Sequence, residues 1–230
     1  MKNNKPNHLV SIISEMEKSV INEHDIQHKL NHYLVKHKQL IQFSEIFHFV
    51  RYDFCRLNFI VGARCLNDEI LWAGLARNLM EELGGKSGIS HNQLYRNFLK
   101  SIGTKPEAEL QCPAFARDFN DSWEEFARNA PLIEALAAIA IYEIFDVPDY
   151  QMLLELLEQA KVPEEGLIFF RVHANAHHFA MFEDTVAWIL TQEGGQEAFD
   201  RAQYFVFETQ RKMWIGLTEC LETKQLVAAN

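Results

Sequence analysis

The stretch Leu167-Ile-Phe-Phe-Arg-Val-His-Ala-Asn-Ala-His-His-Phe-Ala-Met-Phe-Glu-Asp184 is the most informative part of the chain. It follows Pro163 and two acidic residues that suit a helix N-terminus, and it contains no glycine or proline, so it predicts one helix. His173 and His177 lie four residues apart and would project from one face of that helix. Such a pair either packs in a core with satisfied hydrogen bonds or binds a metal ion. Carboxylates and another histidine aimed at the same place from other helices would favour the metal.

The composition indicates an acidic protein with one sizeable core. The 230 residues are 48% hydrophobic, which predicts a single domain over residues 1–230. The 22 basic and 32 acidic residues give a formal charge of −10, which disfavours nucleic acid and anionic membranes as partners. The four cysteines form no C-x-x-C pair, and neither a signal peptide nor an apolar run of about 18 residues is visible. We therefore expect a reduced, cytoplasmic setting.

Nearly every segment has the apolar periodicity of a helix, with breaks at proline, glycine or asparagine, so we predict an all-α fold. Residues 1–39 should form peripheral helices, in which His24, His28 and His32 recur on a face that we interpret as solvated. The core should span residues 40–225. Its predicted helices cover about 40–64, 68–83, 91–102, 118–129, 131–143, 150–160, 164–184 and 196–225.

The predicted helix from Leu40 to Arg64 has apolar residues on two sides, which is typical of a central helix. Glu45 precedes His48 by three residues, a spacing that metal ligands use. The pattern is short and common, and we favour structural hydrogen bonding for it. Tyr52 should face the interior on the same helix.

Two adjacent acids end the next predicted helix. Its apolar face should consist of Trp72, Leu75, Ala76, Leu79 and Leu83. At about 100° per residue, this face includes Glu82 and leaves Glu81 pointing away, so Glu82 is the inward candidate. The loop from Gly84 ends at a predicted N-cap, Ser90, and could fold His91 back over Glu82.

A later helix, which opens at Pro131, is apolar on nearly every side and should be buried. Glu143 shares a face with its apolar residues. An ionised carboxylate there is costly unless it is paired or bound to metal. Alternatively, Glu143 lies near the end of the helix and reaches water.

These motifs together resemble a known family. Asn78-Leu-Met-Glu-Glu-Leu-Gly-Gly, then His91, then Tyr142-Glu143, then Phe169-Phe-x-x-His173 follow in the order seen in the haem-oxygenase-like fold. Within it, the chain is most similar to the diiron oxidases and oxygenases related to the chlamydial death-domain-associating protein, and more distantly to thiaminase II and pyrroloquinoline quinone synthase. The resemblance covers roughly residues 44–221 and implies a bundle of about seven core helices.

The resemblance also implies that histidines and carboxylates of the core helices hold iron, which activates dioxygen. Residues that match ligand positions are Glu82, His91, Glu143 and His173. The family's last motif, His-x-x-x-Asp-x-x-His, here reads His173-x-x-x-His177-x-x-Ala180, so an acid and the final histidine are replaced. With His177 as a fifth ligand, we expect one iron, or a second completed by other residues. Possible additional ligands are Glu45, His48, Glu81 and Asp184.

Three functions remain open. We favour a non-haem iron oxidase or oxygenase that holds a small molecule against Tyr52, Tyr142 and Phe170. The alternatives are a metal-free enzyme like quinone synthase or thiaminase II, and a non-catalytic binding or interaction protein with a degenerate site. A haem oxygenase proper would need His48 as its axial ligand and would leave the other polar residues unexplained. The family tendency and the amphipathic terminal helices favour a homodimer.

Overall fold

The computed structural model describes residues 30, 33–34, 36–51, 54–65, 68–85, 87–175 and 178–228. Within these ranges all regular structure is helical, which confirms the predicted all-α class. The peripheral histidines His24, His28 and His32 lie outside the described residues. The helices are α3 (His37–Val50), α4 (Phe54–Arg64), α5 (Glu69–Glu82), α6 (His91–Ser101), α7 (Ala114–Asn129), α8 (Leu132–Gln159), α9 (Glu164–Asn175), α10 (Glu183–Thr191) and α11 (Gly195–Ala228), with 3-10 turns η1 (Glu107–Glu109) and η2 (His178–Met181).

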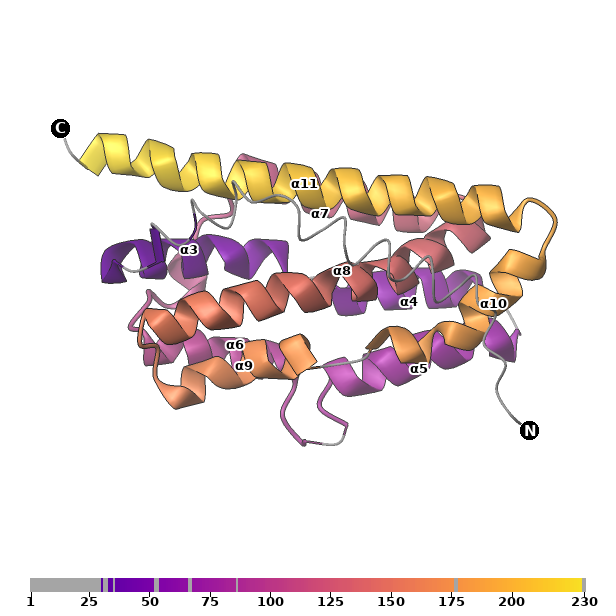
Figure 1. Cartoon of the computed structure of the whole chain (residues 1–230), viewed down its shortest axis with the longest axis horizontal. Coiled ribbons are helices and arrows are strands. Elements are labelled where there is room, and N and C mark those ends of the chain that lie inside the picture. Colours follow the sequence, from indigo (N-terminus) through magenta and orange to yellow (C-terminus); the bar gives the residue numbers. More distant parts are fainter. Residues whose placement is uncertain are drawn as a thin grey trace.

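Helix α8 is the centre of the bundle. It packs against α9 and α11, and α6 packs against α9 on the outer side. Figure 1 shows α11 along one long side of the molecule, with α5 and α10 near one end and α6 and α9 near the other. Every residue from Ala135 to Ile141 is at most 1% exposed, which confirms the prediction of a buried helix that is apolar on all sides.

The predicted break between residues 143 and 150 is wrong, because α8 continues through Pro148 to Gln159. A proline inside a helix removes one backbone hydrogen bond. Here that loss is outweighed by burial on both sides of the proline, where Phe145 and Tyr150 lie in the core. As a result Glu143 lies in the middle of a long helix and not near its end.

The predicted helix from residue 40 to 64 is two helices. α3 ends at Val50 with Arg51 as its C-cap, and α4 begins at Phe54. No glycine or proline marks this junction, so the periodicity alone did not reveal it. The junction gives Arg51 a position at the end of a helix, close to the core.

The predicted histidine helix is also interrupted. α9 ends at Asn175, whose side-chain Nδ2 donates to the carbonyl of Arg171 at 2.8 Å. An asparagine side chain that takes the carbonyl four residues back competes with helix continuation. The helical structure resumes with η2 and α10. The direction of the His178 side chain is therefore not set by the periodicity of α9.

The turn after His178 lies close against α5. A Cβ atom added to Gly74 would lie 2.7 Å from Cδ1 of Phe182 and 3.0 Å from the carbonyl oxygen of Met181. Only glycine permits this approach without a shift of one of the two segments. The contact places the acidic end of α5 beside the start of η2.

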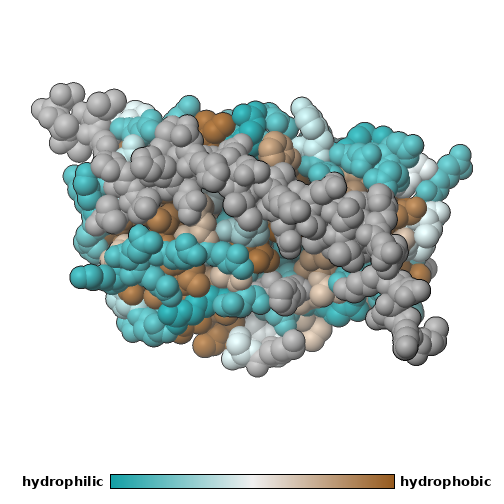
Figure 2. Space-filling view, in the orientation of Figure 1, coloured by the Kyte–Doolittle hydropathy of each residue, from teal (hydrophilic) through white to brown (hydrophobic). Residues whose placement is uncertain are grey.

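No helix in the described part of the chain is both long and apolar enough to cross a membrane. Figure 2 shows that the coloured residues on the face drawn there are largely hydrophilic, with apolar side chains visible between them.

Candidate metal centre

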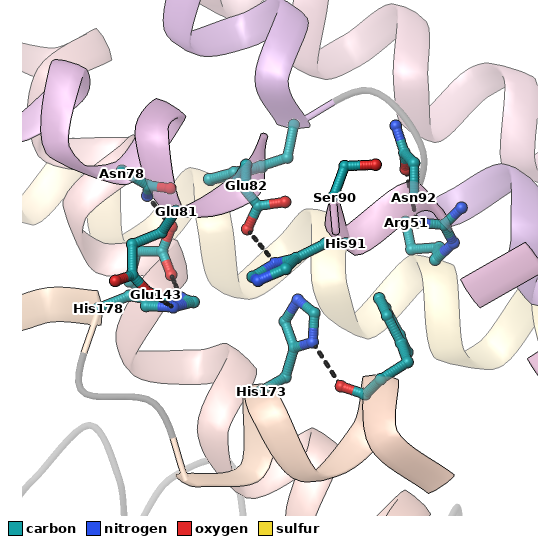
Figure 3. Close-up of polar contacts among 12 residues, drawn as sticks. Arg51, Asn78, Glu81, Glu82, Ser90, His91, Asn92, Glu143, His173 and His178 are labelled. Carbon is teal, nitrogen blue, oxygen red and sulfur yellow. Dashed lines mark hydrogen bonds and ion pairs between the residues drawn. The ribbon is translucent and has the colours of Figure 1, made fainter. Parts of the chain in front are cut away.

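Five elements direct polar side chains into the bundle. These are the C-terminal end of α5 with Glu81 and Glu82, the start of α6 with His91, the middle of α8 with Glu143, the end of α9 with His173, and η2 with His178. Figure 3 shows these side chains converging from opposite sides. The site therefore joins segments that are far apart in sequence.

The α5–α6 loop turns His91 back onto Glu82 as the sequence predicts. Gly84 adopts a φ of 84°, a conformation that glycine adopts without strain. The Ser90 side chain caps α6 by accepting from the backbone N–H of Gln93 at 3.2 Å. Nδ1 of His91 then lies 2.9 Å from Oε1 of Glu82.

Glu82, His91 and His173 form the first cluster. Each offers one potential ligand atom, and these atoms lie within 4.8 Å of one another. Both histidines are buried, and their ring centroids are 4.6 Å apart. One carboxylate and two imidazoles are the donor set that non-haem iron oxygenases use with open coordination positions. The residues present therefore fit an iron ion.

His173 is held in the form that binds metals. Its Nδ1–H donates to the carbonyl of Phe169 at 2.8 Å, which leaves Nε2 as the nitrogen with a free lone pair. The ring stacks on Tyr150 with a centroid distance of 4.4 Å. Burial, reinforced by the charge of His91, lowers the pKa of His173 to about 3, so the imidazole is neutral near pH 7.

Glu82 provides the negative charge of this cluster. Burial alone would raise its pKa, but the hydrogen bond with His91 and the neighbouring imidazoles hold the pKa below its ordinary value. The carboxylate is therefore ionised at neutral pH and available to a cation.

Glu81, Glu143 and His178 form the second cluster. Nδ1 of His178 lies 3.2 Å from Oε2 of Glu143, and Nε2 lies 3.8 Å from Oε2 of Glu81. Asn78, which is fully buried, donates its side-chain N–H to the other oxygen of Glu143. Among the described residues, Nε2 of His178 is buried without a hydrogen-bond partner. A cation that displaces the proton of this nitrogen would find the Glu81 carboxylate beside it.

The charge of the second cluster is balanced through His178. Burial would lower the pKa of this imidazole, but the carboxylates of Glu143, Glu82 and Glu81 outweigh burial and raise it. The ring lies 6.0 Å from that of His91 and 6.1 Å from that of His173, measured between centroids. The two clusters are therefore adjacent.

The structure brings together some of the predicted ligands, including the possible additional ligand Glu81, and adds one, His178. Glu82, His91 and His173 share the first cluster, whereas Glu143 lies in the second. His177 and Tyr52 lie outside the described residues. Ala180, the position of the missing family histidine, is exposed on η2.

His178 was missed because a continuous helix would place it on another face than His173. The interruption after Asn175 brings it to Glu143. The asparagine beside the histidines was the available signal for that interruption.

Glu81 and Glu82 both reach the centre because the buried face of α5 differs from the predicted one. The buried residues are Leu71, Gly74, Leu75 and Asn78. Trp72 and Leu83, which were predicted to face the core, are 51% and 59% exposed. Asn78 therefore lies in the middle of the buried face of α5. Glu81 and Glu82 follow it by three and four residues, so they lie on either side of that face.

Three other predicted additional ligands lie elsewhere. Glu45 accepts from the backbone N–H of Lys105 at 3.3 Å, and Asp184 is exposed at the start of α10. Nε2 of His48 lies 3.5 Å from Glu107, outside both clusters. Phe170 is fully buried against Phe98, whereas Tyr142 lines two small cavities.

His48 is expected to make the stability of the metal-free protein depend on pH. Burial, followed by the positive charge of Arg51, lowers the pKa of His48 to about 4 from an ordinary 6.5. Between these pH values the unfolded chain binds more protons than the folded one, so the unfolding free energy should fall as the pH falls. The slope from one such histidine is at most about 1.4 kcal/mol per pH unit.

Urea unfolding of wild type and His48→Asn at pH 6.5 and 4.5, with chelator present, measures this contribution. The variant should lose less stability between the two pH values. An unchanged loss would show that His48 titrates normally in the folded protein.

Comparisons with known proteins confirm the predicted haem-oxygenase-like fold. A family model described as iron-containing redox enzyme matches residues 43–206. No curated protein matches the chain significantly. Two crystal structures of a CADD-like protein of unknown function from Nostoc punctiforme are similar. The first has a TM-score of 0.76 at 16% identity and covers 93% of this chain and 96% of that one. The second has a TM-score of 0.75 at 14% identity and covers 95% and 96%. Since the family model spans most of the chain, the protein belongs to the family of iron-containing redox enzymes.

Proposed function

We propose that the protein is a non-haem iron oxidase or oxygenase that acts on a small molecule with dioxygen. Glu82, His91 and His173 would hold one iron, and Glu81, Glu143 and His178 a second. The observation that carries the proposal is the first cluster, in which a half-buried carboxylate and two buried imidazoles from three helices lie within 4.8 Å of one another in a member of an iron-containing family.

The proposed second iron is one of the two possibilities that the sequence left open, namely a single iron or a second iron completed by other residues. Both possibilities arose because His177 and Ala180 replace family ligands. His178 supplies an imidazole that the sequence pattern had not assigned. The two clusters together contain three carboxylates and three imidazoles, and the carboxylates offset most of the charge of two ferrous ions.

The chain's own residues would orient the ligands and keep water out. The carbonyl of Phe169 and the ring of Tyr150 fix His173, and Asn78 fixes one oxygen of Glu143. Ligands held by such outer contacts keep their geometry when a substrate enters. Bound ferrous iron would supply the electrons that dioxygen needs to react with an organic molecule.

Ferrous iron, added without oxygen, is expected to stabilise the protein. A ligand that binds only the folded state at a hundredfold excess over its Kd adds about 2.7 kcal/mol. For a chain of this length this corresponds to a rise of several degrees in melting temperature. Calorimetry of chelated and reloaded protein measures the rise, and Glu45→Gln should show the same rise as wild type.

The absence of any rise with ferrous iron, manganese or zinc at neutral pH would contradict every metal-dependent function. It would favour the metal-free alternative with the same fold.

A further inference from the structure

Arg51 is a largely buried cation near the candidate metal centre, and the proposed function does not use it. It follows α3 and turns its guanidinium into the bundle, where Figure 3 shows it beside Asn92. The guanidinium carbon lies 4.0 Å from the ring centroid of Tyr95 and 5.3 Å from that of Phe169. Phe169 in turn lies 4.3 Å from His173, again between centroids. One aromatic ring thus separates Arg51 from a candidate iron ligand.

Within the described residues, Arg51 forms no ion pair. Nη1 donates to Oδ1 of Asn92 at 2.8 Å. Nε is buried without a hydrogen-bond partner. Burial lowers the pKa of Arg51, which reflects the cost of keeping its charge away from water. Stacking over Tyr95 compensates part of that cost but leaves the N–H groups of the Nε edge unused.

The unused edge has the geometry that binds a carboxylate. Since Nη1 is engaged by Asn92, Nε and Nη2 are the two donors that remain on one side of the guanidinium. Two parallel N–H groups on that side match the two oxygens of a carboxylate. The ring of Tyr95 lies against one face of the guanidinium and holds it in place. The hydroxyl of Tyr95 donates to the carbonyl of Ser44 at 2.8 Å.

Two small cavities meet at Arg51. The inner one, of about 10 Å³, is lined by apolar side chains together with the polar groups of Asp146, Asp149 and Gln210. The outer one, of about 20 Å³, is partly open and is lined mainly by aromatic and apolar side chains such as Phe54 and Trp123. Both are water-sized in this state, so a ligand must widen them. Arg51 and Tyr142 belong to the walls of both cavities.

We propose that Arg51 binds the carboxylate of the substrate, which is a small carboxylic acid with an apolar or aromatic body. The outer cavity would accept the body, and the guanidinium would hold the acid one ring away from the metal centre. The statement that this acid is the substrate rests on the proposed function. Binding of the carboxylate by Arg51 does not require iron.

The test uses metal-free protein, because iron itself binds carboxylates. Benzoate and hexanoate are each compared with their primary amides by ligand-observed NMR titration. Wild type should bind at least one acid about 10- to 100-fold more tightly than its amide, as expected for charge-assisted hydrogen bonds. Arg51→Met should abolish this preference. Arg51→Lys should reduce it, because an ammonium group lacks the two parallel N–H groups of the guanidinium.

Arg56→Met is the matched control. Arg56 also lines the outer cavity, but its side chain is half exposed and lies 2.6 Å from Glu124. This variant should keep the preference for the acid. Melting temperature and iron uptake of each variant show whether it is folded. If Arg51→Met does not fold, the preference for acid over amide in Arg51→Lys decides whether Arg51 binds the carboxylate.

Equal binding of acid and amide by wild type, or an unchanged preference in Arg51→Lys, would overturn the proposal. So would loss of the preference in Arg56→Met alone. Failure to take up iron, with carboxylate binding intact, would instead refute the proposed function and leave the role of Arg51 in place.

Discussion

Replacing Glu82 by glutamine is expected to remove iron from the first cluster. The amide has nearly the same shape but no charge, so the ion would lose its only carboxylate in that cluster. Outer residues that merely orient a ligand typically contribute 10- to 100-fold to metal affinity, so loss of the ligand itself should weaken binding by at least about 100-fold. Dioxygen consumption by the iron-loaded protein should fall with it.

Iron per chain after gel filtration measures the effect. Glu45→Gln is the matched control, because Glu45 is a carboxylate that contacts Lys105 away from both clusters. Full iron content in Glu82→Gln, or an equal loss in Glu45→Gln, would contradict the assignment of Glu82.

His178→Ala is expected to lower the iron content from two per chain towards one. The imidazole lies between Glu143 and Glu81, and alanine leaves that pair of carboxylates without a nitrogen donor. Ala180→His should have no effect on iron content, because position 180 is exposed. The family motif alone predicts the opposite outcome for Ala180→His, namely a gain of iron.

Elemental analysis of wild type, His178→Ala, Ala180→His and His177→Ala separates these outcomes. Unchanged iron in His178→Ala would show that the second cluster is only an ion-pair network. Loss of iron in His177→Ala alone would restore the ligand predicted from the motif.

The sequence predicted much of the fold because its helices have clear apolar periodicity and clear ends. The N-cap at Ser90 and the return of His91 to Glu82 followed from local chemistry alone. The burial of α8 followed from its apolar residues on every side. These features depend on neighbours in sequence, which is why periodicity and capping rules identify them.

The features that were predicted wrongly depend on tertiary packing. The α3–α4 junction at Arg51 has no helix-breaking residue, and Pro148 lies inside a helix that packing maintains. The interruption after Asn175 changes which histidine faces Glu143. A motif read along one continuous helix therefore overlooked His178.

Anomalous diffraction at the iron edge, from crystals of iron-loaded protein, tests the central claim most directly. We predict one peak among the side chains of Glu82, His91 and His173 and a second among those of Glu81, Glu143 and His178. A single peak at the first cluster would refute the second iron. No peak at either cluster, in protein that elemental analysis shows to contain iron, would contradict the proposed metal centre.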